Sequence, residues 1–164
     1  VTATINGVAV STRAPASLGY RQVSTLAAVS KAGAALTYAT LSPNCALVTG
    51  AATGIQITPL KGSGECAISV TSAGTATAAG VTAILPIRLT LGVQTIPAIA
   101  AKKSVKLAGV SNFGEKVTYK ASGSCSVKKN VLTAKKGKCT IAASAMGQDG
   151  LFGAMEQKAV LQIK

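Results

Sequence analysis

The sequence contains no histidine and no tryptophan, and aromatic residues make up only 3% of its 164 residues. It has four acidic residues against 17 lysines and arginines, which gives a net charge of +13. These few side chains do not supply a catalytic triad, a carboxylate pair or a phosphate-binding loop, so we expect no enzyme active site. No apolar run reaches the 18 residues that a membrane-spanning helix needs, so we expect no transmembrane segment.

The scarcity of acids also disfavours bound metal. Glu65, Glu115, Asp149 and Glu156 are scattered along the chain, whereas calcium takes several oxygen ligands that usually include carboxylates. The cysteines form no closely spaced pair of the kind that structural zinc sites use. We therefore expect neither a metal nor a cofactor.

Four cysteines are present, and we interpret them as disulfide partners. They are Cys45, Cys66, Cys125 and Cys139. Disulfides form and persist in oxidising compartments, outside the cytosol. The sequence therefore predicts an extracellular or cell-surface location.

An internal repeat sets the domain organisation. Residues 26–38 align without a gap with residues 107–119, and a pattern of Gly-x-Cys-x-Ile followed by Gly occurs at 64–74 and again at 137–147. We place the boundary near residue 92, which predicts one domain over residues 1–92 and a second over residues 93–164. Four cysteines allow three pairings. The repeat favours Cys45 with Cys66 and Cys125 with Cys139, because each copy then closes in the same way.

Hydrophobic alternation predicts strands. In the second copy Val117, Tyr119 and Ala121 alternate with polar residues, the period of a strand with one buried face. Similar runs predict strands at 23–30, 34–41, 55–60, 66–73, 81–91, 102–109, 131–135 and 157–163. Many short strands without a convincing helix predict an all-β fold of two tandem immunoglobulin-like Greek-key β-sandwiches, with one intradomain disulfide each.

Two local features refine this prediction. Asn6-Gly7 predicts a tight turn in an additional N-terminal hairpin over residues 1–10. The step from Tyr38 to Cys45 is odd, so the strand must break or bulge at 42–44 if both side chains face the core. We expect Tyr38 and Tyr119 to pack in the core, as a tyrosine corner does.

The cysteine motifs resemble the immunoglobulin-like repeats of large secreted bacterial surface proteins, especially actinobacterial ones. The similarity covers most of residues 23–164. In the second copy it rests on Val117, Tyr119, Cys125, Gly137, Cys139, Ile141, Ala143, Gly147 and Phe152; in the first it rests on Leu36, Tyr38, Cys45, Gly64, Cys66, Ile68 and Gly74. The first copy departs from the pattern after Gly74, where TATAAG has no aromatic residue. The resemblance implies stalks, spacers or adhesive modules.

The charge is concentrated in the second copy, which has twelve basic and three acidic residues. A cluster of lysines surrounds its predicted hairpin: Lys128, Lys129, Lys135, Lys136 and Lys138. They form a candidate anion-binding patch for glycans or cell-wall polymers, or they solubilise the surface and protect an edge strand. We expect no nucleic-acid partner, because no aromatic platform accompanies the lysines.

Two functions follow from these features. The first is a non-enzymatic structural module of a stalk, surface layer or filament, whose partners are neighbouring immunoglobulin-like domains or other copies of itself. The second is an adhesive module that binds anionic polymers through the lysine patch. As a refinement of the first, residues 1–10 would be donated as a strand to a neighbouring subunit.

Overall fold

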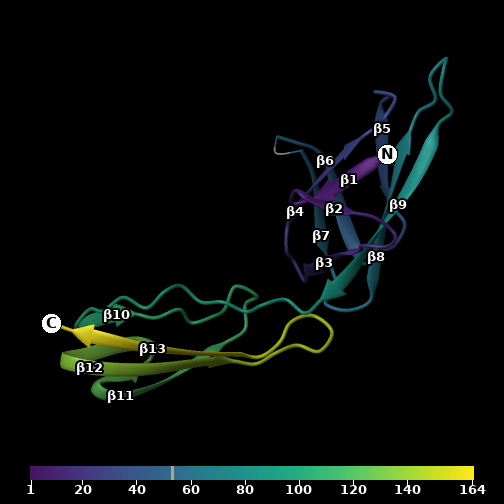
Figure 1. Cartoon of the computed structure of the whole chain (residues 1–164). Coiled ribbons are helices and arrows are strands. Elements are labelled where there is room, and N and C mark those ends of the chain that lie inside the picture. The colour runs from purple at the N-terminus through teal and green to yellow at the C-terminus, as the bar shows by residue number, and fades with distance from the viewer. Residues whose placement is uncertain (53) are drawn as a thin grey trace. The chain divides into compact units, whose positions relative to one another are not determined.

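The computed structural model describes residues 1–52 and 54–164, and in this part of the chain every regular element is a strand (Figure 1). The chain divides into two compact units, Val1–Gly92 and Val93–Lys164. Among the described residues there is no helix long and apolar enough to cross a membrane.

Unit 1 consists of two sheets. The first sheet has the order β2-β1-β4-β7-β6, with β1 at Thr2–Ile5, β2 at Val8–Val10, β4 at Ser24–Val29, β6 at Cys45–Ala51 and β7 at Gly54–Pro59. The second has the order β3-β9-β8-β5, with β3 at Ala16–Gly19, β5 at Leu36–Thr40, β8 at Glu65–Ser72 and β9 at Val81–Thr90.

The chain passes between these sheets in the manner of an immunoglobulin domain. It changes sheet from β4 to β5, from β5 to β6 and from β7 to β8, and strand β3 pairs with β9 in parallel. The first sheet thus corresponds, through β1, β4, β7 and β6, to the four-stranded sheet of such domains. Strands β5, β8 and β9 correspond to the opposite sheet. The Greek-key sandwich predicted for this unit is confirmed.

Buried aliphatic side chains from both sheets form the core of unit 1. Leu26 and Ile57 from the first sheet join Ile68 and Ile87 from the second in one cluster. Tyr38 is half-buried against this cluster, as predicted. Alternate residues of each strand supply the core, because successive side chains of a strand point to opposite faces.

A disulfide joins the two sheets of unit 1. Cys45, the first residue of β6, is bonded to Cys66 in β8, and their Cα atoms are 6.0 Å apart. The chain leaves β5 after Thr40 and enters β6 through a turn at residues 41–44. This turn is the break that the odd spacing between Tyr38 and Cys45 required.

The N-terminal hairpin belongs to unit 1 itself. Asn6 and Gly7 both have positive φ, 51° and 80°, the conformation that a two-residue hairpin turn needs. The Asn6 side chain accepts a hydrogen bond from the Thr25 amide at 2.9 Å. Because β1 lies between β2 and β4, residues 1–10 complete the sheet of their own unit.

Unit 2 has four strands, and their pairing follows that of β4 to β9 in unit 1. They are β10 at Ser104–Lys106, β11 at Val117–Lys128, β12 at Val131–Ala145 and β13 at Met155–Ile163. Strand β12 pairs with β11 along one edge; along its other edge it pairs with β10 in its first part and with β13 from Gly137 onward. The first half of β12 therefore corresponds to β7 of unit 1, and the second half corresponds to β8.

The two halves of β11 and β12 meet at a corner. The register shifts between Gly123 and Cys125, where Gly123 faces Cys139 but Cys125 faces Ala134. Burial along β12 changes phase at the same place, from even positions before the shift to odd positions after it. Strands that change sheet through such a bulge form the corner of a sandwich. The expected short strands are thus replaced here by two long, bent ones.

The core of unit 2 contains residues from both halves of the bent strands. Leu132 from the first half of β12 and Ile141 from the second are fully buried in one cluster. Cys125 and Cys139 are disulfide-bonded across the corner, with Cα atoms 5.4 Å apart. Each unit therefore has its own disulfide, and the pairing favoured by the repeat is confirmed.

Tyr119 of β11 packs in this core and is anchored at its tip. Its hydroxyl donates a hydrogen bond to the Ala108 carbonyl at 2.8 Å, and burial raises the pKa of the phenol above its ordinary value. A neutral, hydrogen-bonded hydroxyl is the form in which a buried tyrosine is stable. The predicted structural role of Tyr119 is confirmed.

Candidate functional site

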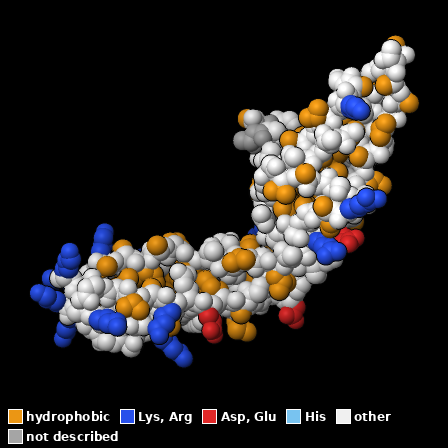
Figure 2. Space-filling model, viewed as in Figure 1, with side chains coloured by type: hydrophobic (Ala, Val, Ile, Leu, Met, Phe, Trp, Pro, Cys, Tyr) orange, Lys and Arg blue, Asp and Glu red, His pale blue; other side chains and the backbone are white. Residues whose placement is uncertain are grey.

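The lysines singled out in the sequence lie at one end of unit 2. Lys128 ends β11, Lys129 forms the following turn, and Lys135, Lys136 and Lys138 lie on β12 near the corner. All five are exposed. Figure 2 shows basic side chains gathered at this end of the unit. We call it the lysine-rich end, and it also includes Lys106 of β10.

Lys106 was not among the lysines predicted from the sequence. In the antiparallel ladder Lys106 faces Val131 of β12, and Lys128 of β11 faces the same valine from the other side. Directly opposed residues of a sheet share one face, with Cβ atoms about 4.5–5.5 Å apart. Two lysines therefore flank an exposed valine on the outer face of the sheet, about 10 Å apart at their Cβ atoms.

A row of hydroxyl groups lies beside these lysines. Ser104 faces Thr133, and Thr133 faces Ser126 on its other side. These residues are two positions along from the lysine row on each strand, so they share its face. All three are exposed. Ammonium and hydroxyl donors next to one another are suited to an anionic, oxygen-rich ligand.

The other lysines occupy different surroundings. Lys136 and Lys138 lie in the irregular segment of β12 at the corner, and Lys138 faces Gln162 of β13. Lys129 has a positive φ of 49° in the tight turn with Asn130. The five predicted lysines thus share one end of the unit but do not form one continuous row.

The acids of unit 2 lie elsewhere. Glu156 of β13 faces Ser144, near the end of β12 that is remote from its lysines. Asp149 is in the turn bridged by Gln148 and Phe152, and Glu115 accepts a backbone hydrogen bond from Ser111. Within the described part of the chain, no three His, Cys, Asp or Glu side chains form a cluster that could hold a metal.

The end of unit 2 opposite the lysines is closed by a buried glutamine. The Gln94 side chain donates hydrogen bonds to the carbonyls of Met146 and Gly153, both at 2.7 Å, and accepts one from the Ser111 hydroxyl at 2.7 Å. The Phe113 and Phe152 rings stack with their centroids 4.7 Å apart. This end is structural, because its polar groups bond to one another.

No family model matches the sequence, and no curated protein matches it. The crystal structure of Drosophila N-cadherin EC1-4 is similar with a TM-score of 0.28 and 12% sequence identity, over 92% of this chain and 48% of that one. The chain thus spans about half the length of that structure.

Proposed function

We propose that this chain is a non-enzymatic structural module of an extracellular bacterial surface protein, as part of a stalk, a surface layer or a filament. The observation that carries this proposal is the repetition of one sandwich topology, closed both times by a disulfide within the unit. Disulfides are typical of secreted proteins. The resemblance of the cysteine motifs to bacterial immunoglobulin-like repeats supports the bacterial surface.

A structural module of this kind should resist extension. Each disulfide prevents the chain between its cysteines from extending: 21 residues in sequence separation in unit 1 and 14 in unit 2. The neighbours of such a module would be further immunoglobulin-like domains or other copies of the chain.

Pulling the chain by its ends in single-molecule force spectroscopy tests this function. We expect two cooperative unfolding events, one for each unit. Because an extended residue spans about 3.3–3.6 Å, reduction should lengthen the unfolded chain by about 70–75 Å for the 21-residue segment and 45–50 Å for the 14-residue one. Gradual extension without force peaks would contradict a mechanical role.

A second candidate function is adhesion to an anionic polymer through the lysine-rich end. The observation that favours it is the position of Lys106 and Lys128 on either side of Val131, beside a row of three hydroxyl groups. Sulfated or acidic glycans and phosphate-containing wall polymers have the matching chemistry. Attraction of this kind is screened by salt, with a Debye length of about 8 Å at physiological ionic strength.

Chromatography on immobilised heparin tests the adhesive function. We expect retention that falls steeply with salt, and the double variant Lys106→Gln/Lys128→Gln should elute at lower salt. By analogy with phosphate contacts, its slope of log affinity against log salt should be smaller by about 1 to 2. The matched control Lys31→Gln/Lys61→Gln removes the same charge from unit 1. If the two double variants eluted at the same salt concentration, the retention would be due to non-specific charge, which would contradict a specific site at the lysine-rich end.

A further inference from the structure

The repeat allows the closed end of unit 2 to be compared with the same end of unit 1. The two alignments place Ser111 on Ser30 and Met146 on Ala73. Ser72 pairs with Val81 and Ala145 with Met155, so the connection in unit 2 is one residue longer, and Gly153 corresponds to Ala79. In unit 2 these positions supply the three hydrogen-bonding partners of the buried Gln94 side chain. In unit 1 the corresponding end contains a pocket.

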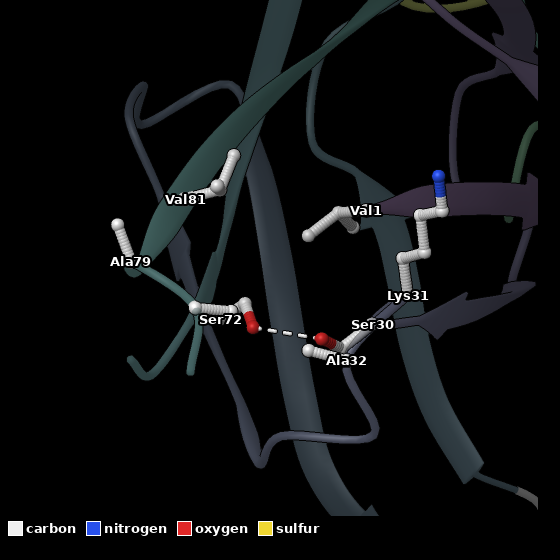
Figure 3. A pocket seen from close by; sticks show the side chains of 8 residues that line it. Val1, Ser30, Lys31, Ala32, Ser72, Ala79 and Val81 are labelled. Carbon is white, nitrogen blue, oxygen red and sulfur yellow. Dashed lines mark hydrogen bonds between the residues drawn. The ribbon is translucent and has the colours of Figure 1, made fainter. Parts of the chain in front are cut away.

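This pocket has a volume of ≈ 230 Å³ (Figure 3). Its lining residues come from the N-terminus, from the segment after β4 and from the ends of β8 and β9: Val1, Ser30, Lys31, Ala32, Ser72, Ala78, Ala79 and Val81. The close-up shows Val1 and Val81 on either side of the opening, with Ser30 and Ser72 joined by a hydrogen bond below them.

The pocket is open because small residues replace the aromatic pair. The alignment places Ala32 on Phe113. The bridge from Thr75 to Ala78 corresponds to the bridge from Gln148 to Phe152, which places Ala78 on Phe152. In unit 2 those two rings stack on one another, whereas two alanines leave the corresponding space of unit 1 unfilled. Ala32 and Ala78 thus line the pocket at the end that corresponds to the site of the buried Gln94.

Strand register indicates where a counterpart of Gln94 would lie relative to Val1. In unit 2 the Asn112 amide donates to the Thr95 carbonyl at 3.0 Å, so Thr95 lies beside Asn112, the counterpart of Lys31. In unit 1 Thr2 pairs with Val29, which puts Val1 opposite Ser30. A residue preceding Val1 would then lie opposite Lys31, in the position of Thr95, and the residue before that would take the position of Gln94.

We propose that the pocket at this end of unit 1 is the acceptor for an extended segment attached directly before Val1, with an amide side chain two residues before Val1. The segment has the chemistry of Val93-Gln94-Thr95, which enters unit 2 in the same way. Its amide reaches Ser30 and the carbonyls of Ala73 and Ala79. The inference rests on the repeat and on the pocket, and it stands apart from the proposed function.

Ser72 explains how unit 1 stays intact when the pocket is empty. Its counterpart in unit 2 is Ala145, which has no polar group. In unit 1 the Ser72 hydroxyl lies 2.9 Å from the Ser30 hydroxyl and donates to the Ala73 carbonyl at 3.3 Å. These are the partners that the amide satisfies in unit 2. Buried polar groups need such partners, so Ser72 takes the place of the amide until one enters.

The test is a pair of full-length proteins with three added residues before Val1, Val-Gln-Thr in one and Val-Ala-Thr in the other. Relative to the alanine extension, the glutamine extension should raise the melting temperature of unit 1 by roughly 4–8 °C. It should also slow amide hydrogen exchange at residues 30–33. Both proteins have the same N-terminal charge, so the comparison isolates the amide.

A second pair with Ser30→Ala in both proteins controls for general stabilisation. Removing the hydroxyl that meets the amide should abolish at least half of the difference between the two extensions, because interacting groups are not additive. Equal melting temperatures and equal exchange for the two extensions without Ser30→Ala would overturn the proposal. A difference that is unchanged by Ser30→Ala would place the amide outside the pocket and overturn it equally.

Discussion

Replacing Cys45 and Cys66 together by alanine should lower the unfolding free energy of unit 1 by about 3 kcal/mol. A disulfide restricts the unfolded chain, and the chain-entropy model assigns about 3 kcal/mol to a loop of roughly 15 residues and slightly more to a longer one. The two cysteines are separated by 21 residues and join the two sheets of the sandwich. Changing both avoids an unpaired buried thiol.

Denaturant unfolding of each unit, followed by a probe placed in that unit, measures this loss. The matched control is the Cys125→Ala/Cys139→Ala pair, which should destabilise unit 2 by a similar amount and leave unit 1 unchanged. A typical domain has a total stability of about 5–15 kcal/mol, so either change should be large. A loss below about 1 kcal/mol in unit 1 would show that its disulfide is not a principal restraint.

The variant Gly123→Ala should destabilise unit 2 by about 2–4 kcal/mol. Gly123 lies at the corner of β11 with a φ of +86°, and a Cβ there would contact the Lys138 carbonyl. Strained backbone conformations cost of order 1–3 kcal/mol, and overpacking adds a comparable amount. The corner is where the disulfide joins the two bent strands, so relief of the clash would have to move them.

The matched control is Gly114→Ala in the same unit. Gly114 has a similar φ of +88°, but a Cβ added there meets nothing within 4 Å. The control variant should therefore lose only the free energy that it costs to hold alanine at a positive φ, about 1 kcal/mol. Thermal melts of both variants distinguish the two contributions. Equal losses would indicate that the corner tolerates a side chain and that its close packing is unimportant.

The disulfide pairing and the identity of most strands were predictable because the repeat provides two independent copies of the same pattern. Cys66 and Cys139 occur in the same Gly-x-Cys-x-Ile motif, and alternation placed both on a buried face. The turn at Asn6-Gly7 was equally clear, since those residue types favour the positive φ values that the turn has.

The fused strands of unit 2 could not be predicted from alternation. At Lys135-Lys136-Gly137-Lys138 the pattern of burial changes phase, and in a sequence such a change resembles a loop between two strands. The shorter segment between the cysteines of unit 2 indicated that its strands are fused. Its sequence separation is 14, against 21 in unit 1, which leaves too few residues for the separate loops of unit 1.

The lysine row was only partly predictable for a related reason. Lys128 was found as part of a local cluster, but Lys106 is more than twenty residues away in sequence. It reaches the same face only through the pairing of β10 with β12. Contacts across a sheet depend on register, and a single short strand such as β10 has too few residues to define its register from sequence.

The most direct test of the central claim is to map the disulfides by mass spectrometry after proteolysis without reduction. Two units that each close on themselves should give one linked peptide pair containing Cys45 and Cys66 and another containing Cys125 and Cys139. Free thiols in the folded protein, or a peptide pair that joins one unit to the other, would contradict the account.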